Sequence, residues 1–297
     1  MYDPIPPEVR PRLRALRIRP RRAAGGRGIG AHHSRSRGAG LEFAQYRAYD
    51  PGDEPRQIDW KLYARSDRFF VREAERESPL TVWVLVDASA SMGQADAGRP
   101  EWTRLDAARA LAACIAEVAM AQGDACGLVA LRAAGPQLVP PGTGPRQRDR
   151  LLLALRSVTA DGGFPDPERL APVWERVAPD DMVVLLSDCF DGDCVALAER
   201  LAAARREVLA VQVLTAEERD FPFREGRRFI DPETGEELLG DGAALRDEFL
   251  QRFGAAQRAL QARFDAAGIR HAGYVLDRPL DEPLRRLFGA RREPGGA

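Results

Sequence analysis

The sequence predicts an α/β fold: a doubly wound, mostly parallel sheet with helices on both faces, plus an N-terminal extension with short strands. Two observations carry this prediction. From Leu80 onward, short apolar runs alternate with longer segments of helical periodicity, which is the pattern of parallel strands buried on both faces. The preceding part differs in composition, so we divide the chain into an N-terminal arginine-rich arm and wrapping subdomain over 1–78 and an α/β domain over 79–297.

The predicted elements follow one another regularly in the second part. Strands are expected over 81–87, 125–131, 182–187, 207–214 and 270–276, with an antiparallel return near 136–139. Helices are expected over 103–122, 146–157, 168–178, 193–205, 242–267 and 280–289. The first of these helices has Thr103 and Asp106 at the spacing of a capping box. The stretch around 231–235 is expected to be irregular.

The first part contains two different segments. Residues 10–37 hold many arginines, several glycines and no acid, and such a stretch cannot bury enough apolar surface to fold alone. We expect a solvated arm laid over the rest of the protein, and the alternative is an electrostatic contact for an acidic partner, RNA or anionic lipid. Residues 41–78 are mixed in composition, and a short strand is expected over 68–72.

The bulk composition limits the function classes. The net charge is −1, and residues 10–37 carry no aromatic side chain on which bases could stack, so both observations argue against a nucleic-acid partner. No run reaches the roughly 18 apolar residues of a membrane-spanning helix, and the N-terminus has no apolar secretory region. We therefore expect a cytosolic protein, in which the four cysteines are small core residues.

The segment 82–93 reads VWVLVDASASMG and changes abruptly from apolar residues to an acid and two hydroxyls. In an extended backbone, Asp87, Ser89 and Ser91 project the same way. Asp188 ends a second apolar strand, and α/β sheets bind ligands at the carboxyl edge where such strands end side by side. An all-oxygen set of carboxylates and hydroxyls suits Mg²⁺. The alternative is that the hydroxyls cap a turn and Asp87 accepts backbone amides.

A second group of functional candidates lies in the first part. Residues 58–61 read IDWK and place an acid, an indole and the only lysine of the chain together. We expect a structural role, in which Trp60 covers a sheet edge and Asp59 pairs with an arginine. The alternative is a partner-binding surface made of Asp59, Trp60 and Lys61.

An enzymatic function is the main competing hypothesis. Asp87 could serve a metal-dependent hydrolase, or act as the nucleophile of a phosphotransfer enzyme. However, DASAS lacks the second acid of a D-x-D motif, and Lys61 lies outside the predicted sheet. His271 begins the last predicted strand and is far in sequence from any glycine-framed serine. We therefore expect a protein without catalytic activity.

Two resemblances support this expectation. The DASAS of residues 87–91 resembles the D-x-S-x-S of the metal-ion-dependent adhesion site in von Willebrand factor A-like domains. Nearly the whole chain resembles the domain of unknown function 58 (DUF58) family. The residues that carry this second resemblance are GLEF (40–43), YDPGD (49–53), RQIDWK (56–61), AR (64–65), FVRE (70–73), DPETGEELL (231–239) and PLDEPL (279–284).

These resemblances imply a doubly wound α/β domain without demonstrated enzymatic activity, acting with a MoxR-type AAA+ ATPase that helps to assemble or activate other proteins. They also imply a metal site with an open position, which a partner's acidic side chain fills. One departure weakens the expected Mg²⁺ site. A-type domains supply a threonine from a G-x-T-D loop, whereas residues 161–166 read DGGFPD. Thr159 lies a few residues early, and Asp166 could substitute through a water.

Overall fold

The computed structural model describes residues 3–20, 43–50, 55, 58–74 and 79–289. They fall into two compact units, one made of Met1–Gly25 and Leu80–Ala297 and the other of Gly26–Pro79. The boundary predicted from the sequence lies between residues 78 and 79 instead, which places the N-terminal residues in the first part. The first residues group with the larger unit because Ile5, Leu13 and Leu16 are buried in its core.

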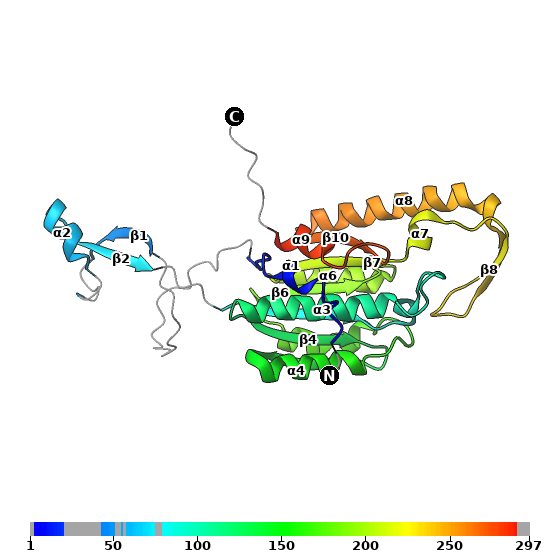
Figure 1. The fold of residues 1–297 in the computed structure, drawn as a ribbon, viewed down its shortest axis with the longest axis horizontal. Coiled ribbons are helices and arrows are strands. Elements are labelled where there is room, and N and C mark those ends of the chain that lie inside the picture. Colours follow the sequence, from blue (N-terminus) through cyan, green and yellow to red (C-terminus); the bar gives the residue numbers. More distant parts are fainter. Residues whose placement is uncertain (1–2, 21–42, 51–54, 56–57, 75–78, 290–297) are drawn as a thin grey trace, which may run out of the picture. The chain divides into compact units, whose positions relative to one another are not determined.

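The larger unit is built on a six-stranded sheet with the strand order β10-β7-β6-β3-β4-β5 (Figure 1). These strands are β3 (Thr81–Asp87), β4 (Ala125–Leu131), β5 (Gln137–Gly142), β6 (Met182–Ser187), β7 (Glu207–Leu214) and β10 (Arg270–Val275). All neighbouring pairs are parallel except β4 and β5. The predicted α/β fold is confirmed.

Helices cover both faces of the sheet. They are α3 (Arg104–Ala121), α4 (Gly144–Ser157), α5 (Ala171–Arg176), α6 (Gly192–Ala203), α7 (Ala216–Asp220), α8 (Gly242–Ala266) and α9 (Glu282–Phe288), with the 3-10 turns η2 (Ala90–Gly93) and η3 (Pro167–Leu170). Alternate residues of β3 enter different cores, with Val84 packed among α3, α4 and α9 and Leu85 packed among α5, α6 and α8. None of the described helices is long and apolar enough to span a membrane.

The start of the arginine-rich segment packs against the larger unit instead of extending into solvent. Its short helix α1 (Arg10–Leu13) buries Leu13, and Ile18 is also buried. Arg12 donates to the fully buried carboxylate of Asp281 at 2.9 Å. Residues 10–20 thus lie over the larger unit with most of their side chains exposed, as expected of a solvated arm, but three apolar side chains enter the core; residues 21–37 lie outside the described residues.

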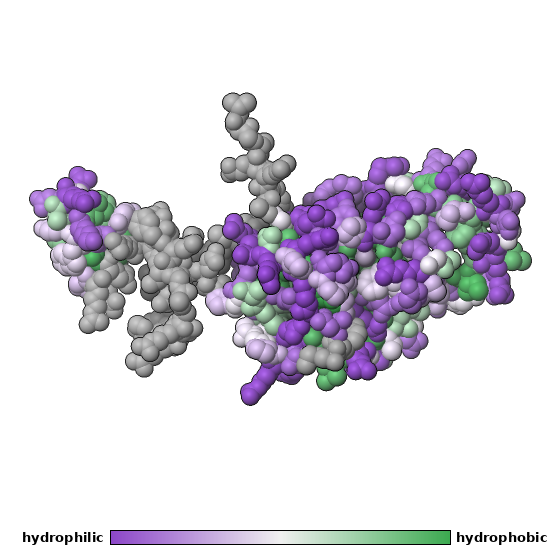
Figure 2. Space-filling model, in the orientation of Figure 1, coloured by the Kyte–Doolittle hydropathy of each residue, from purple (hydrophilic) through white to green (hydrophobic). Residues whose placement is uncertain are grey.

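The stretch that the sequence analysis expected to be irregular contains an antiparallel hairpin. Its strands are β8 (Gly226–Ile230) and β9 (Glu237–Asp241), with Ile230 paired to Glu237 next to the turn. Figure 2 shows a mostly hydrophilic surface with some apolar surface near this hairpin, where Ile230, Leu238 and Leu239 are exposed. Because both strands carry charged and exposed residues, their sequence lacks the alternation of a half-buried strand.

The smaller unit contains β1 (Phe43–Ala48), α2 (Trp60–Ser66) and β2 (Phe70–Ala74). The two strands are antiparallel, so the short strands predicted for the N-terminal extension are confirmed, with the second at 70–74 instead of 68–72. Tyr63 stacks on Phe69 with ring centroids 4.4 Å apart.

Candidate functional site

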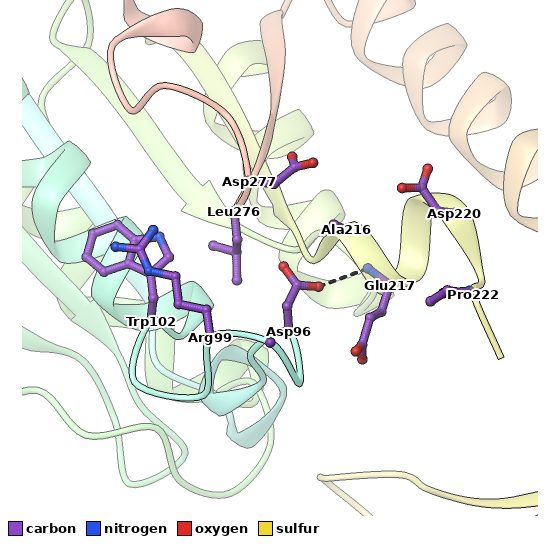
Figure 3. Close-up of a pocket in the computed structure, with 10 residues that line it drawn as sticks. Asp96, Arg99, Trp102, Ala216, Glu217, Asp220, Pro222, Leu276 and Asp277 are labelled. Carbon is purple, nitrogen blue, oxygen red and sulfur yellow. Dashed lines mark hydrogen bonds between the residues drawn. The ribbon is translucent and has the colours of Figure 1, made fainter.

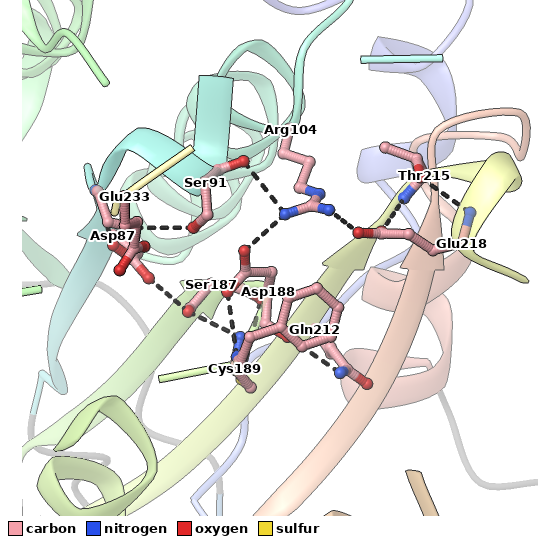
Figure 4. Close-up of polar contacts among 12 residues, drawn as sticks. Asp87, Ser91, Arg104, Ser187, Asp188, Cys189, Gln212, Thr215, Glu218 and Glu233 are labelled. Atoms are coloured by element: carbon pink, nitrogen blue, oxygen red, sulfur yellow. Dashed lines mark hydrogen bonds and ion pairs between the residues drawn. The ribbon is translucent and has the colours of Figure 1, made fainter. Parts of the chain in front are cut away.

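The candidate site lies where β3 and β6 end. The two strands are parallel neighbours with Val86 opposite Leu186, so the residues that follow them emerge at the same edge of the sheet. Asp87 ends β3, Ser89 is the residue before η2, and Ser91 lies in η2. Asp188 follows β6, and Figure 4 shows it with Asp87 and Ser91. All four residues are buried. The structure thus brings the predicted site residues to one place.

Asp87 is held by hydrogen bonds on both carboxylate oxygens. Its Oδ1 accepts from the Ser89 backbone N–H at 2.9 Å, and its Oδ2 accepts from the Ser187 hydroxyl at 2.6 Å. Burial raises the pKa of Asp87 to about 6; the hydrogen bond from Ser187 opposes this rise, and the negative charge of Asp188 adds to it. Asp87 is therefore a fixed, partly destabilised anion at neutral pH.

The two predicted serine ligands face each other. Ser89 is extended and η2 begins after it, which returns Ser91 to the same side. Their Oγ atoms are 3.0 Å apart. Adjacent ligands of an octahedral Mg²⁺ ion with bonds of 2.0–2.1 Å are separated by about 2.9 Å. The spacing of the two hydroxyls therefore fits two neighbouring positions around such an ion.

Asp188 has a cationic partner that the sequence analysis missed. Arg104 Nη1 lies 2.6 Å from Asp188 Oδ2 and also donates to the Ser91 carbonyl at 3.1 Å. The same guanidinium pairs with Glu218 on α7, and it lies over the ring of Phe190 at 5.3 Å. Arg104 is only 3% exposed, so it neutralises one of the two buried aspartates.

A sequence signal for this role exists at the start of α3. Arg104 directly follows the N-cap Thr103, and the positive end of a helix dipole disfavours a cation there. An arginine at the first position of a helix therefore suggests a nearby acid that offsets the cost. The sequence does not say which acid, because Asp188 is 84 residues away.

The loop that lacks the expected threonine contacts the serine segment through its backbone. The Ala90 N–H donates to the Gly162 carbonyl at 2.7 Å, and the Asp161 N–H donates to the Ala88 carbonyl at 3.0 Å. Thr159 is exposed, and Asp166, the residue expected to substitute through a water, is exposed and pairs with Arg169 at 3.6 Å.

A glutamate from the β8–β9 hairpin approaches the site instead. Glu233 interacts with the hydroxyls of Ser91 and Ser89, and Figure 4 shows it beside Asp87 and Ser91. Its Oε2 lies 3.9 Å from the position that a Cβ at Gly163 would take. Partial burial raises the pKa of Glu233, the hydrogen bond from Ser91 lowers it, and the charges of Asp188 and Asp191 raise it further.

The donor set fits a hard cation. Asp87 supplies a carboxylate, Ser89 and Ser91 supply two hydroxyls at suitable spacing, and Asp188 provides a further acid whose charge is shared with Arg104. Within the described parts of the chain, no group of three or more His, Cys, Asp or Glu side chains is placed to hold a metal. A cation here would therefore depend on the serine hydroxyls.

The second candidate group is partly structural. Asp59 is the N-cap of α2 and accepts from the backbone N–H groups of Lys61 and Leu62 at 2.9 and 3.0 Å. Trp60 makes edge contacts with Tyr63 and Phe69, yet 58% of it is exposed. Asp59 thus has a capping role that the sequence analysis did not foresee, while Trp60 keeps the exposure that a partner-binding surface needs.

A cavity of about 280 Å³ lies between α7 and the loop after η2 (Figure 3). Asp96 accepts from the Glu217 N–H at 2.9 Å, and the Ala97 N–H donates to the Glu217 carboxylate at 3.0 Å. These bonds fasten α7 to the loop that follows the serine segment. They hold Glu218 in place for its ion pair with Arg104.

Comparisons with known proteins extend over most of the chain. The model of one family, described as protein of unknown function DUF58, matches residues 45–260. The chain is 30% identical over 262 residues to the uncharacterized proteins Rv1480 of Mycobacterium tuberculosis and Mb1516 of Mycobacterium bovis, and each alignment covers 86% of this chain and 81% of the relative.

Among solved structures, the chain is similar to the conserved hypothetical protein BatB from Bacteroides thetaiotaomicron, with 15% identity and a TM-score of 0.37, covering 64% of this chain and 98% of that one. It is also similar to the SpRpn10 VWA domain, with 14% identity and a TM-score of 0.40, covering 70% of this chain and 94% of that one.

Proposed function

The chain belongs to the DUF58 family, and from that premise we propose that it is a non-enzymatic protein-interaction module of the cytosol that works with a MoxR-type AAA+ ATPase. The partner engages the carboxyl edge of the sheet at Asp87, Ser89 and Ser91. The observation that carries the proposal is the meeting of these oxygens at the end of β3, with the two hydroxyls 3.0 Å apart. Partnership with the ATPase rests on the family resemblance.

A bound Mg²⁺ would add a positive charge that attracts an acidic side chain of the partner. Asp87, Ser89 and Ser91 would hold it, with Asp188 nearby. Arg104 already balances Asp188, so Asp188 adds little net negative charge at this position. The missing threonine removes one ligand, so we expect weak metal binding that a partner's carboxylate strengthens.

The contacts of Asp87 support a role without catalysis. Both of its carboxylate oxygens accept hydrogen bonds, and it is only 1% exposed. Within the described residues of the larger unit there is no lysine that could assist phosphotransfer at Asp87.

Binding to a purified MoxR-type ATPase from the same genome tests the proposal. We expect the full chain to bind in Mg²⁺ and to lose at least about tenfold in affinity, or 1.4 kcal/mol, in Asp87→Ala and Ser91→Ala. Asp166→Ala, an exposed acid paired with Arg169, is the matched control and should bind like the wild type. Equal affinity in all four proteins, or no binding in any, would contradict the proposal, provided melting curves show that the variants fold.

A further inference from the structure

The tip of the β8–β9 hairpin reaches the candidate site. Glu233 lies in the turn between the two strands, and its carboxylate interacts with the hydroxyls of Ser91 and Ser89. These are the same two hydroxyls that would serve a cation and its acidic ligand. A carboxylate from the chain itself therefore stands where the proposed function requires a carboxylate from outside.

The turn fixes the backbone that carries this glutamate. Asp231 Oδ1 accepts from the backbone N–H groups of Glu233 at 2.8 Å and Thr234 at 3.1 Å. The turn then reverses at Gly235, whose φ of +74° is a conformation that favours glycine. Opposite the turn, Gly163 lies near the Glu233 carboxylate, since a Cβ at Gly163 would be 3.9 Å from Glu233 Oε2, an ordinary contact distance.

The base of the hairpin is anchored independently of the site. Phe221 stacks on Phe249 of α8 at 4.4 Å and on Phe229 of β8 at 5.8 Å, and Phe223 contacts Phe229 edge-on at 5.5 Å. The hairpin strands themselves are largely exposed. The tip can therefore leave the site while the aromatic base keeps the hairpin attached.

The contact at the tip is one that a competitor can replace. Glu233 is itself exposed, its carboxylate lies beside Asp87 and Ser91 (Figure 4), and the negative charges of Asp188 and Asp191 raise its pKa. Like charges in a partly buried site weaken an anionic contact. An acidic side chain of a partner could accept from the same two serine hydroxyls, and the hairpin turn would not restrict its approach.

We propose that Glu233 is an internal occupant of the site, which an acidic side chain of the partner must displace to reach Ser89 and Ser91. This inference rests on the proposed function for the identity of the competitor. The contact between Glu233 and the serines does not depend on it, so the two can be tested separately.

Hydrogen exchange of the hairpin amides, measured on the full chain, tests the contact itself. We expect exchange over residues 226–241 to rise by about threefold or more in Glu233→Ala and in Ser91→Ala, because each change removes one side of the contact between the hairpin tip and the serine segment. Glu236→Ala changes an exposed acid of the same turn and should leave exchange unchanged. Exchange in Glu233→Ala equal to that of the wild type would overturn the proposal.

Binding to the MoxR-type ATPase tests the occlusion. We expect Glu233→Ala to bind about threefold or more tightly than the wild type, Glu236→Ala to bind equally, and Asp87→Ala/Glu233→Ala to lose the gain. Loss of binding in Asp87→Ala together with unchanged affinity in Glu233→Ala would refute the internal occupant and leave the proposed function standing. If no variant binds, the proposed function fails. The exchange measurement then still tests the contact: raised exchange in Glu233→Ala supports it, and unchanged exchange overturns it.

Discussion

Removal of the Arg104 guanidinium should be among the most damaging changes in the larger unit. Arg104 and Asp188 are 3% and 1% exposed, and their charged atoms are 2.6 Å apart. Arg104→Met keeps most of the side-chain volume but leaves Asp188 as a buried anion beside Asp87. Breaking a buried ion pair from one side costs about 3–5 kcal/mol, so we expect a loss of that size in the free energy of unfolding.

Urea unfolding at neutral pH in EDTA measures this loss without a cation that could offset the aspartates. The matched control is Arg263→Met, because Arg263 makes a two-pronged pair with Glu199 at 2.8 Å in a half-exposed position on the surface. An exposed pair is worth at most about 1 kcal/mol. If Arg104→Met and Arg263→Met destabilise the protein equally, Arg104 does not neutralise a buried charge.

Three further changes test other parts of the structure. Burial raises the pKa of Asp87 from 3.8 to about 6, so the stability that its protonated form provides is present below pH 3.8 and is lost as pH rises through 6. In EDTA, the free energy of unfolding of Asp87→Asn should therefore rise relative to that of the wild type between pH 4 and 7, by roughly 3 kcal/mol at most. A difference that does not change with pH would contradict this pKa. Gly162→Ala should cost about 1–3 kcal/mol, since φ at Gly162 is +66° and the new Cβ would lie 2.8 Å from Ala133 Cβ; Gly98→Ala, which meets nothing within 4 Å, should be tolerated. Leu16→Ala should lower the free energy of unfolding by about 2–4 kcal/mol, because Leu16 is buried in the core. Leu239 is exposed, so Leu239→Ala should change it by no more than about 0.5 kcal/mol. Equal Tm values for these two variants would show that Leu16 does not contribute to the core.

The central strands could be predicted to the residue, whereas the elements at the edge could not. β3, β4, β6 and β7 are buried on both faces, so their limits are visible as apolar runs. β5 extends to Gly142, beyond the predicted return near 136–139. Its end could not be predicted, because the strand is half-exposed and contains Pro140 and Pro141. Proline is tolerated at a sheet edge, but it removes the sequence signal of a strand.

The residues of the candidate site also fall into those whose place could be predicted from the sequence and those whose place could not. Asp87 and Asp188 could be placed together because parallel strands in register end at one edge, and that argument needs only the strand limits. Arg104 and Glu233 could not be placed, because neither lies at the end of a sheet strand whose register fixes its position. The hairpin that carries Glu233 is exposed on both strands, so no apolar pattern marks it. Metal binding remains a prediction.

The cation site itself is tested most directly by calorimetric titration of Mn²⁺ or Mg²⁺ into the wild type and Asp87→Ala, with Ser91→Ala as a milder variant. We expect weak binding of one ion per chain by the wild type, reduced binding in Ser91→Ala and none in Asp87→Ala, because the carboxylate carries the charge that the neutral hydroxyls cannot supply. An identical response in the wild type and Asp87→Ala would contradict a cation site at the end of β3 and would leave these residues with a turn-capping role alone.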